Sequence, residues 1–170
     1  GIRAYCAYAY GWVEDEADRL EVAGDFEGSE YHRDRAKLLY LRGRDLGFHY
    51  IALDHDGREE AIRGGMEAFE AWLNTEFTEP EDALILVWTG YAWGSAINNG
   101  KNDLALVADL PYAEAMITRA VELDRSVNNY AGLVFLGVVQ SSSLSGNRDL
   151  GRQLFEEAIE GNERRYLLAQ

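Results

Sequence analysis

Histidines and clustered carboxylates are the side chains of this chain that could bind a metal or move a proton. The histidines are His32, His49 and His55. They show neither HExxH nor HxH spacing, and metal sites normally need such clustering. Asp54, Asp56 and Glu59 lie close in sequence, but the regular 12-residue ligand pattern of a calcium loop is missing. We therefore predict no metal site and no cofactor.

Nucleophilic chemistry has little support either. Ser141, Ser142 and Ser143 have no histidine nearby in sequence. Cys6 lies among alanines and tyrosines, which favours a small buried thiol over a reactive one. No glycine-rich phosphate loop is present, because Gly43 and Gly64-Gly65 are expected inside helices. We predict that the chain is not an enzyme.

Arg44 is the first polar candidate for contact with a ligand. It lies with Arg42 and Asp45 in a helix that otherwise looks covered. A buried charge is costly unless it is paired. Arg44 therefore either meets a carboxylate inside the protein or binds an anionic group of a ligand, and we favour the structural ion pair.

Composition predicts one all-helical domain over residues 1–170. Hydrophobic residues make up 47% of the 170 and there are two prolines, which suits helices better than many short strands. The net charge of −14 disfavours nucleic acid as a partner. The charge-free run from Ala83 to Ile97 is too short for an ordinary membrane span, which needs about 18 residues or more.

Apolar periodicity and breaker residues predict the positions of about seven to eight antiparallel helices. They are residues 2–23, 31–53, 58–75, 82–98, 111–124, 128–143 and 148–160, with an eighth starting over 163–170. Gly24 and Gly28 are expected to break the chain, so that the acidic stretch 14–30 forms an exposed connection. The loop 98–109 is expected to hold one helical turn near Leu104–Ala108.

Small residues recur in a comb that predicts stacked helix pairs. In each comb a glycine is followed, one helix later, by two small residues seven apart: Gly47, Ala61 and Ala68; Gly90, Ala113 and Ala120; Gly137, Gly151 and Ala158. The glycines recur at about the period of helical solenoids. We expect helices 31–53, 82–98 and 128–143 to form an inner, concave layer. Helices 58–75, 111–124 and 148–160 would lie outside it, and helix 2–23 would be an extra cap.

Side chains three before and one after each glycine should face this concave layer. Together with two neighbouring tryptophans they are Arg44, Phe48, Val87, Trp88, Tyr91, Trp93, Val134 and Val138. They describe an apolar channel with a few polar points, as in pockets for small molecules. Ordinary core packing remains open and is favoured for Trp88 and Trp93, whereas Tyr91 is balanced because a buried hydroxyl needs a partner.

Five strings carry a resemblance to a known family: LYLRGRDLG at 39–47, VWTGYAWGSAI at 87–97, ADLP at 108–111, AVELD at 120–124 and VFLG at 134–137. In this order they resemble the T component of TRAP (tripartite ATP-independent periplasmic) transporters, over roughly residues 4–168. The resemblance implies a tetratricopeptide-like fold. However, the connection from Gly90 to Ala113 is longer than in an ordinary tetratricopeptide repeat.

The resemblance also implies a biological setting. Such proteins are periplasmic lipoproteins that partner the solute-binding P component and help to handle an apolar ligand, and trimers are implied for the family. The lipid anchor is expected in the full-length precursor, and Cys6 is not taken as the lipidated residue. The alternative function is a helical-repeat scaffold that binds a peptide and has no ligand cavity.

Overall fold

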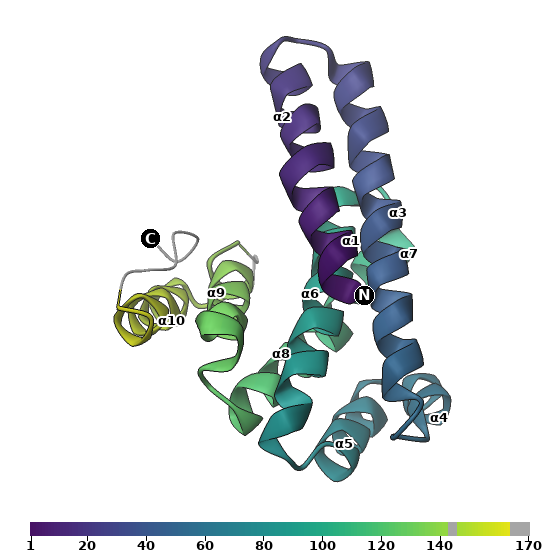
Figure 1. Ribbon diagram of the computed structural model, residues 1–170, viewed down its shortest axis with the longest axis vertical. Helices are drawn as coiled ribbons and strands as arrows, with labels where there is room; N and C mark the ends of the chain where they lie inside the picture. The colour runs from purple at the N-terminus through teal and green to yellow at the C-terminus, as the bar shows by residue number, and fades with distance from the viewer. Residues whose placement is uncertain (143–145, 164–170) are drawn as a thin grey trace. The chain divides into compact units, whose positions relative to one another are not determined.

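The part of the chain described by the computed structural model, residues 1–142 and 146–163, is built from helices and contains no strand (Figure 1). The helices are α1 Ile2–Tyr8, α2 Asp15–Val22, α3 Phe26–Ile51, α4 Arg58–Arg63, α5 Met66–Glu76, α6 Ala83–Asn99, α7 Leu104–Val107, α8 Leu110–Leu123, α9 Val127–Ser142 and α10 Arg148–Gly161. A π-helix, η1 (Ala9–Glu14), joins α1 to α2, and a 3-10 turn, η2 (Pro80–Asp82), precedes α6. The predicted all-α fold class, a helical array, is confirmed.

The helices divide into two compact units. The first unit comprises Gly1–Asp56 and Trp88–Ala113, and the second comprises Gly57–Val87 and the described residues from Glu114 onwards. Two helices contribute to both, since α6 and α8 each contain a boundary. That residues 1–170 form a single domain remains a prediction.

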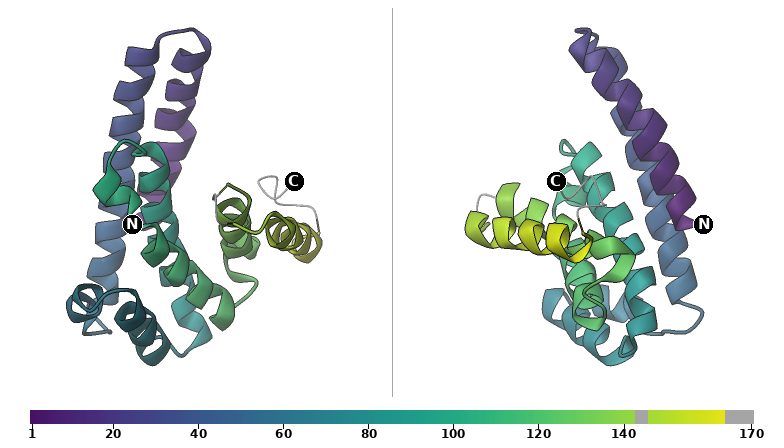
Figure 2. Two further views of the ribbon diagram at one scale, coloured as in Figure 1. Left: turned by 180° about the vertical axis from the view of Figure 1, so that it is seen from behind. Right: turned by 60° about the vertical axis from the view of Figure 1, so that its left-hand side comes forward.

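An antiparallel hairpin dominates the first unit: α1, η1 and α2 run beside α3 along much of its length (Figure 2). The buried side of the first arm is formed by residues of small or moderate size at intervals of three to four: Ile2, Cys6, Ala9, Val13 and Ala17. Their spacing is the helical period, which agrees with the one helix predicted over residues 2–23. The prediction is confirmed, with a π-helical turn in the middle.

The turn of this hairpin corrects two predictions. Gly24 has a φ of 82°, which glycine adopts without steric cost, and it ends the first arm as expected. Gly28, in contrast, lies in the first turn of α3, where its N–H donates to the N-cap carboxylate of Asp25 at 2.9 Å. α3 therefore begins at Phe26 rather than 31. The predicted exposed connection 14–30 is wrong, because the acidic stretch is almost all helix.

Two further helices differ from the sequence prediction. The segment 58–75 is interrupted at Gly64-Gly65, where Gly65 has a φ of 86°, so that α4 and α5 are separate helices rather than one. The helix predicted over 128–143 begins with three left-handed residues, Asn128, Asn129 and Tyr130. Residue 143 and most of the predicted eighth helix lie outside the described residues.

Close helix packing in the second unit confirms the third comb of small residues. A Cβ added to Gly137 of α9 would approach the Phe155 ring of α10 to 2.9 Å. One added to Gly151 of α10 would meet Ser141 and, at 3.0 Å, the carbonyl oxygen of Gly137. The absence of side chains at these glycines thus lets α9 and α10 pack backbone against backbone.

Candidate functional site

The predicted site residues on α3 and α6 meet where the two helices approach most closely. Gly47 of α3 faces the Thr89 side chain of α6, which lies where a Cβ of residue 47 would be. This contact brings Phe48 beside Trp93, with ring centroids 5.4 Å apart at an angle of 82°. Both rings are buried, at 5% and 4% exposure. The edge-to-face geometry is the favourable one for an aromatic pair.

Trp93 also has its polar atom satisfied within the protein. Its indole Nε1 donates to Oδ2 of Asp109 at 3.2 Å, and its ring stacks on Tyr112 at 6.0 Å and 17°. Asp109 lies at the end of the 98–109 connection, just before α8. Trp93 therefore anchors this long connection against α6.

Arg44 has the carboxylate partner that we favoured from the sequence. Its Nη2 lies 2.8 Å from Oδ1 of the neighbouring Asp45, and its Nε donates to the same oxygen at 2.9 Å. The guanidinium carbon also lies 5.4 Å from the centre of the Trp93 ring, a cation–π contact. The charge of Arg44 is thus paired within the first unit, although the Asp45 side chain is 63% exposed and not inside the protein as expected from the sequence.

A second group of aromatic rings surrounds Trp88 of α6. Tyr91 packs edge-on against Trp88 at 5.8 Å, and Tyr40 of α3 packs against Tyr91 at 6.5 Å. On another side, the guanidinium carbon of Arg3 lies 5.5 Å from the centre of the Trp88 ring. The buried Nε1 of Trp88 has no acceptor among the described residues. A buried N–H without an acceptor is uncommon and costs free energy.

The three predicted valines lie in the second unit, unlike the other five site residues. Val87 is 2% exposed and lies against Gly132 of α9, whose added Cβ would be 3.7 Å from Cγ2 of Val87. Val134 is half-buried, and Val138 is 51% exposed. The contacts thus join Arg44, Phe48 and Trp93 in one group and Trp88 and Tyr91 in another. A ligand-binding role for any of the eight stays a prediction.

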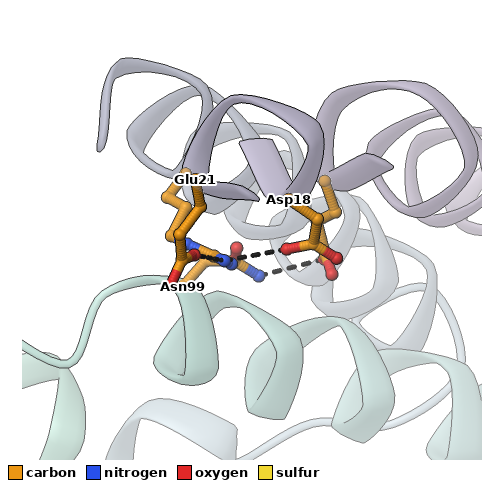
Figure 3. Close-up of polar contacts among 5 residues, drawn as sticks. Asp18, Glu21 and Asn99 are labelled. Carbon is orange, nitrogen blue, oxygen red and sulfur yellow. Dashed lines mark hydrogen bonds and ion pairs between the residues drawn. The ribbon is translucent and has the colours of Figure 1, made fainter. Parts of the chain in front are cut away.

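Polar contacts that the sequence did not reveal join the two arms of the hairpin to each other and the first arm to α6. Nη2 of Arg33 on α3 bonds to Asp18 at 2.8 Å and to Glu21 at 2.6 Å, both on α2. Nδ2 of Asn99, at the end of α6, donates to Oε1 of Glu14 at 3.0 Å. Figure 3 draws these contacts, with Asp18, Glu21 and Asn99 labelled. Nothing in the local sequence signals them, because the partners are 12 to 85 residues apart.

Burial also changes the acidity of two groups inside the hairpin. It raises the pKa of the Cys6 thiol from an ordinary value of 9.0 to about 12. Burial raises the pKa of the Tyr40 phenol as well, and the hydrogen bond to Glu14 adds to this effect. Cys6 is therefore a protonated, buried thiol, as its sequence neighbours predicted.

The side chains that could ligate a metal ion do not cluster in the described residues. Among residues 1–142 and 146–163, no three side chains of His, Cys, Asp or Glu lie close enough together to hold a metal ion. None of the helices in that part of the chain has the length and hydropathy needed to span a bilayer.

Comparison with known proteins gave one finding. A family model described as "TRAP transporter T-component" matches residues 2–170, which is nearly the whole chain. No curated protein matches. No solved structure matches either.

Proposed function

The chain belongs to the T-component family of TRAP transporters, and on this premise we propose that it binds the solute-binding P component of its transporter in the periplasm. As a T component, the chain is an accessory protein of TRAP transport. The match over residues 2–170 is the observation that carries the proposal, since it covers both compact units and not one repeat alone. The proposal includes a lipid anchor in the precursor and no catalytic step.

Light scattering after gel filtration tests this binding directly. The chain would be measured alone, with the P component of the same transporter, and with a solute-binding protein of an unrelated uptake system as the control. We expect a complex of defined stoichiometry with the P component and no complex with the unrelated solute-binding protein. Separate elution at micromolar concentrations of both proteins would contradict the proposal and favour a scaffold that binds some other peptide. The mass of the chain alone also reports whether it forms the trimer that its family implies.

A second candidate function is the binding of an amphipathic small molecule, and the surroundings of Trp88 favour it. The unpartnered indole N–H of Trp88 could donate to a ligand oxygen, and the nearby Arg3 has no carboxylate partner among the described residues. The rings of Phe48 and Trp93 and the Nε1 atom of Trp88 are all buried, so a ligand would reach them only if neighbouring side chains moved. Burial of the apolar surface of the ligand would contribute a binding free energy of about 25 cal/mol per Å².

A fluorescent fatty acid serves as the probe for this second candidate. We expect saturable binding that Trp88→Phe weakens, because phenylalanine keeps an aromatic ring and removes the N–H donor. Trp12→Phe is the matched control, since Trp12 is 68% exposed on another helix. Equal affinities of both variants and the wild type would remove Trp88 from the ligand site.

A further inference from the structure

The first arm of the hairpin exposes two stacked aromatic side chains. Tyr8 at the end of α1 is 42% exposed, and Trp12 in η1 is 68% exposed. Their ring centroids lie 6.1 Å apart with an interplanar angle of 24°. Neither belongs to the buried stripe that includes Ala9 and Val13, and their exposure shows that they contribute little to the core. Two large rings on the outside of a helix therefore need a different explanation.

The facing side of α3 continues this aromatic surface. Tyr31, Arg35, Leu38 and Arg42 are separated by four, three and four residues, which puts them on one face of a helix. Tyr31 is 67% and Leu38 is 55% exposed, and both arginines are exposed. The helical spacing alone therefore places these four side chains on the same face of α3.

Arg35 joins the two helices into one surface. Its Nη2 donates to the hydroxyl of Tyr8 at 2.9 Å, and its guanidinium carbon lies 5.8 Å from the centre of the Tyr8 ring. The contact connects the Tyr8–Trp12 stack to the exposed side of α3. We call this surface the hairpin face, and its residues are Tyr8, Trp12, Tyr31, Arg35, Leu38 and Arg42.

The composition of the hairpin face is that of a protein–protein contact. Tyrosine, tryptophan and arginine are the residue types most enriched at interface positions that dominate binding energy. Single exposed apolar residues are normal on any protein surface. Here, however, the Arg35 guanidinium of α3 contacts Tyr8 of α1, and the Tyr8 ring stacks on Trp12, so that exposed side chains of both arms of the hairpin adjoin one another.

Charge indicates what chemistry the partner must have. The chain has a net charge of −14, and Arg33, Arg44 and Arg125 are each paired with carboxylates. Arg35 and Arg42 have no carboxylate partner among the described residues, although the chain contains 30 Asp and Glu residues. Arginines left without a carboxylate in an acidic protein complement acidic groups supplied from outside.

We propose that the hairpin face is the docking surface for the P component, and that the P component brings carboxylates to Arg35 and Arg42 around an apolar patch that packs on Trp12 and Tyr31. The inference rests on the proposed function. It adds the surface and the chemistry of the partner. Aromatic packing would supply most of the affinity, whereas the arginines would give the contact its salt dependence.

Titration of the P component against matched variants tests the inference. Trp12→Ala and Arg42→Glu alter the face, while Phe26→Ala and Arg152→Glu are the controls. Phe26 is 70% exposed but lies on another side of α3, and Arg152 is an exposed arginine of the second unit. We expect both face variants to bind at least about tenfold more weakly, whereas the controls stay within about twofold of the wild type. Circular dichroism melts would verify that every variant is folded.

Each outcome separates the docking surface from the proposed function. If the wild type binds the P component and the face variants bind equally well, the hairpin face is the wrong surface and the proposed function stands. If the wild type does not bind the P component, both fail. If the face variants lower the mass of the chain alone in light scattering, the face belongs to a second copy of the chain and the proposal is overturned. Binding that weakens between 50 and 500 mM NaCl in the wild type, and less in Arg42→Glu, supports the charge assignment.

Discussion

The α1–α3 hairpin and the α9–α10 pair are both antiparallel helix pairs, but they use their residues in opposite ways. In α9–α10 the glycines Gly137 and Gly151 bring the backbones together, and the outer sides expose few large apolar residues. In the α1–α3 hairpin, alanines and a cysteine fill the seam, a polar network connects the arms, and aromatic rings remain outside.

The difference shows that similar helix pairs can bury or expose their large side chains to different extents. A pair with glycines in its seam gains stability from the close approach of its helices. A pair with exposed tyrosine, tryptophan and arginine keeps surface that folding has not buried. Substitutions can therefore test the two regions separately. In the α9–α10 pair they should change the free energy of unfolding through packing, and in the hairpin they should change how that free energy depends on pH and salt.

The largest effect is expected from filling the α9–α10 seam. Gly151→Leu should lower the free energy of unfolding by about 1–3 kcal/mol or more, because the new side chain meets Ser141 and the backbone oxygen of Gly137. The measurement is urea unfolding followed by circular dichroism. Gly11→Ala on the hairpin is the control, since its Cβ would meet no atom within 4 Å, and it should leave stability unchanged or slightly raise it. Equal losses in both variants would contradict the comparison.

A smaller effect is expected from alkaline pH on the hairpin. The folded-state pKa of Cys6, about 12, lies above the ordinary 9.0, so the folded chain holds this proton more tightly than the unfolded chain. Its contribution to stability is complete below about pH 9 and is lost as pH rises towards 12, at up to about 1.4 kcal/mol per pH unit. Cys6→Ala should flatten this slope. Rapid thiol labelling of the native chain at pH 8 would show instead that Cys6 is not buried.

The smallest effect is expected from the polar network between the arms. Arg33→Met should cost about 1 kcal/mol, because Arg33 joins α3 to both Asp18 and Glu21 of α2. Arg19→Met should cost less, since Arg19 pairs with Glu16 one turn away on the same helix. Urea unfolding in low and high salt measures both, and the difference between the variants should shrink at 1 M NaCl. A difference that does not change with salt would mean that the Arg33 side chain acts through packing.

Much of the fold could be predicted from local signals. Apolar spacing gave the positions of most helices, and the Gly137–Gly151 comb predicted a close pair that the structure contains. Two of the errors came from glycines: Gly28 is accommodated by the Asp25 cap, whereas Gly65 takes a positive φ and separates α4 from α5. A glycine permits both outcomes, and neighbouring contacts decide between them.

The candidate site was less predictable, because its meaning depends on which side chains meet. The sequence by itself determined an all-helical chain, the apolar character of α6 and membership of the T-component family, since these depend on local periodicity and on residue strings. Only the tertiary structure decided that Trp93 is bonded to Asp109, that Arg33 joins two carboxylates, and that Tyr8 and Arg35 form one exposed face. Those pairs lie 12 to 27 residues apart, and no periodic pattern specifies contacts over such separations.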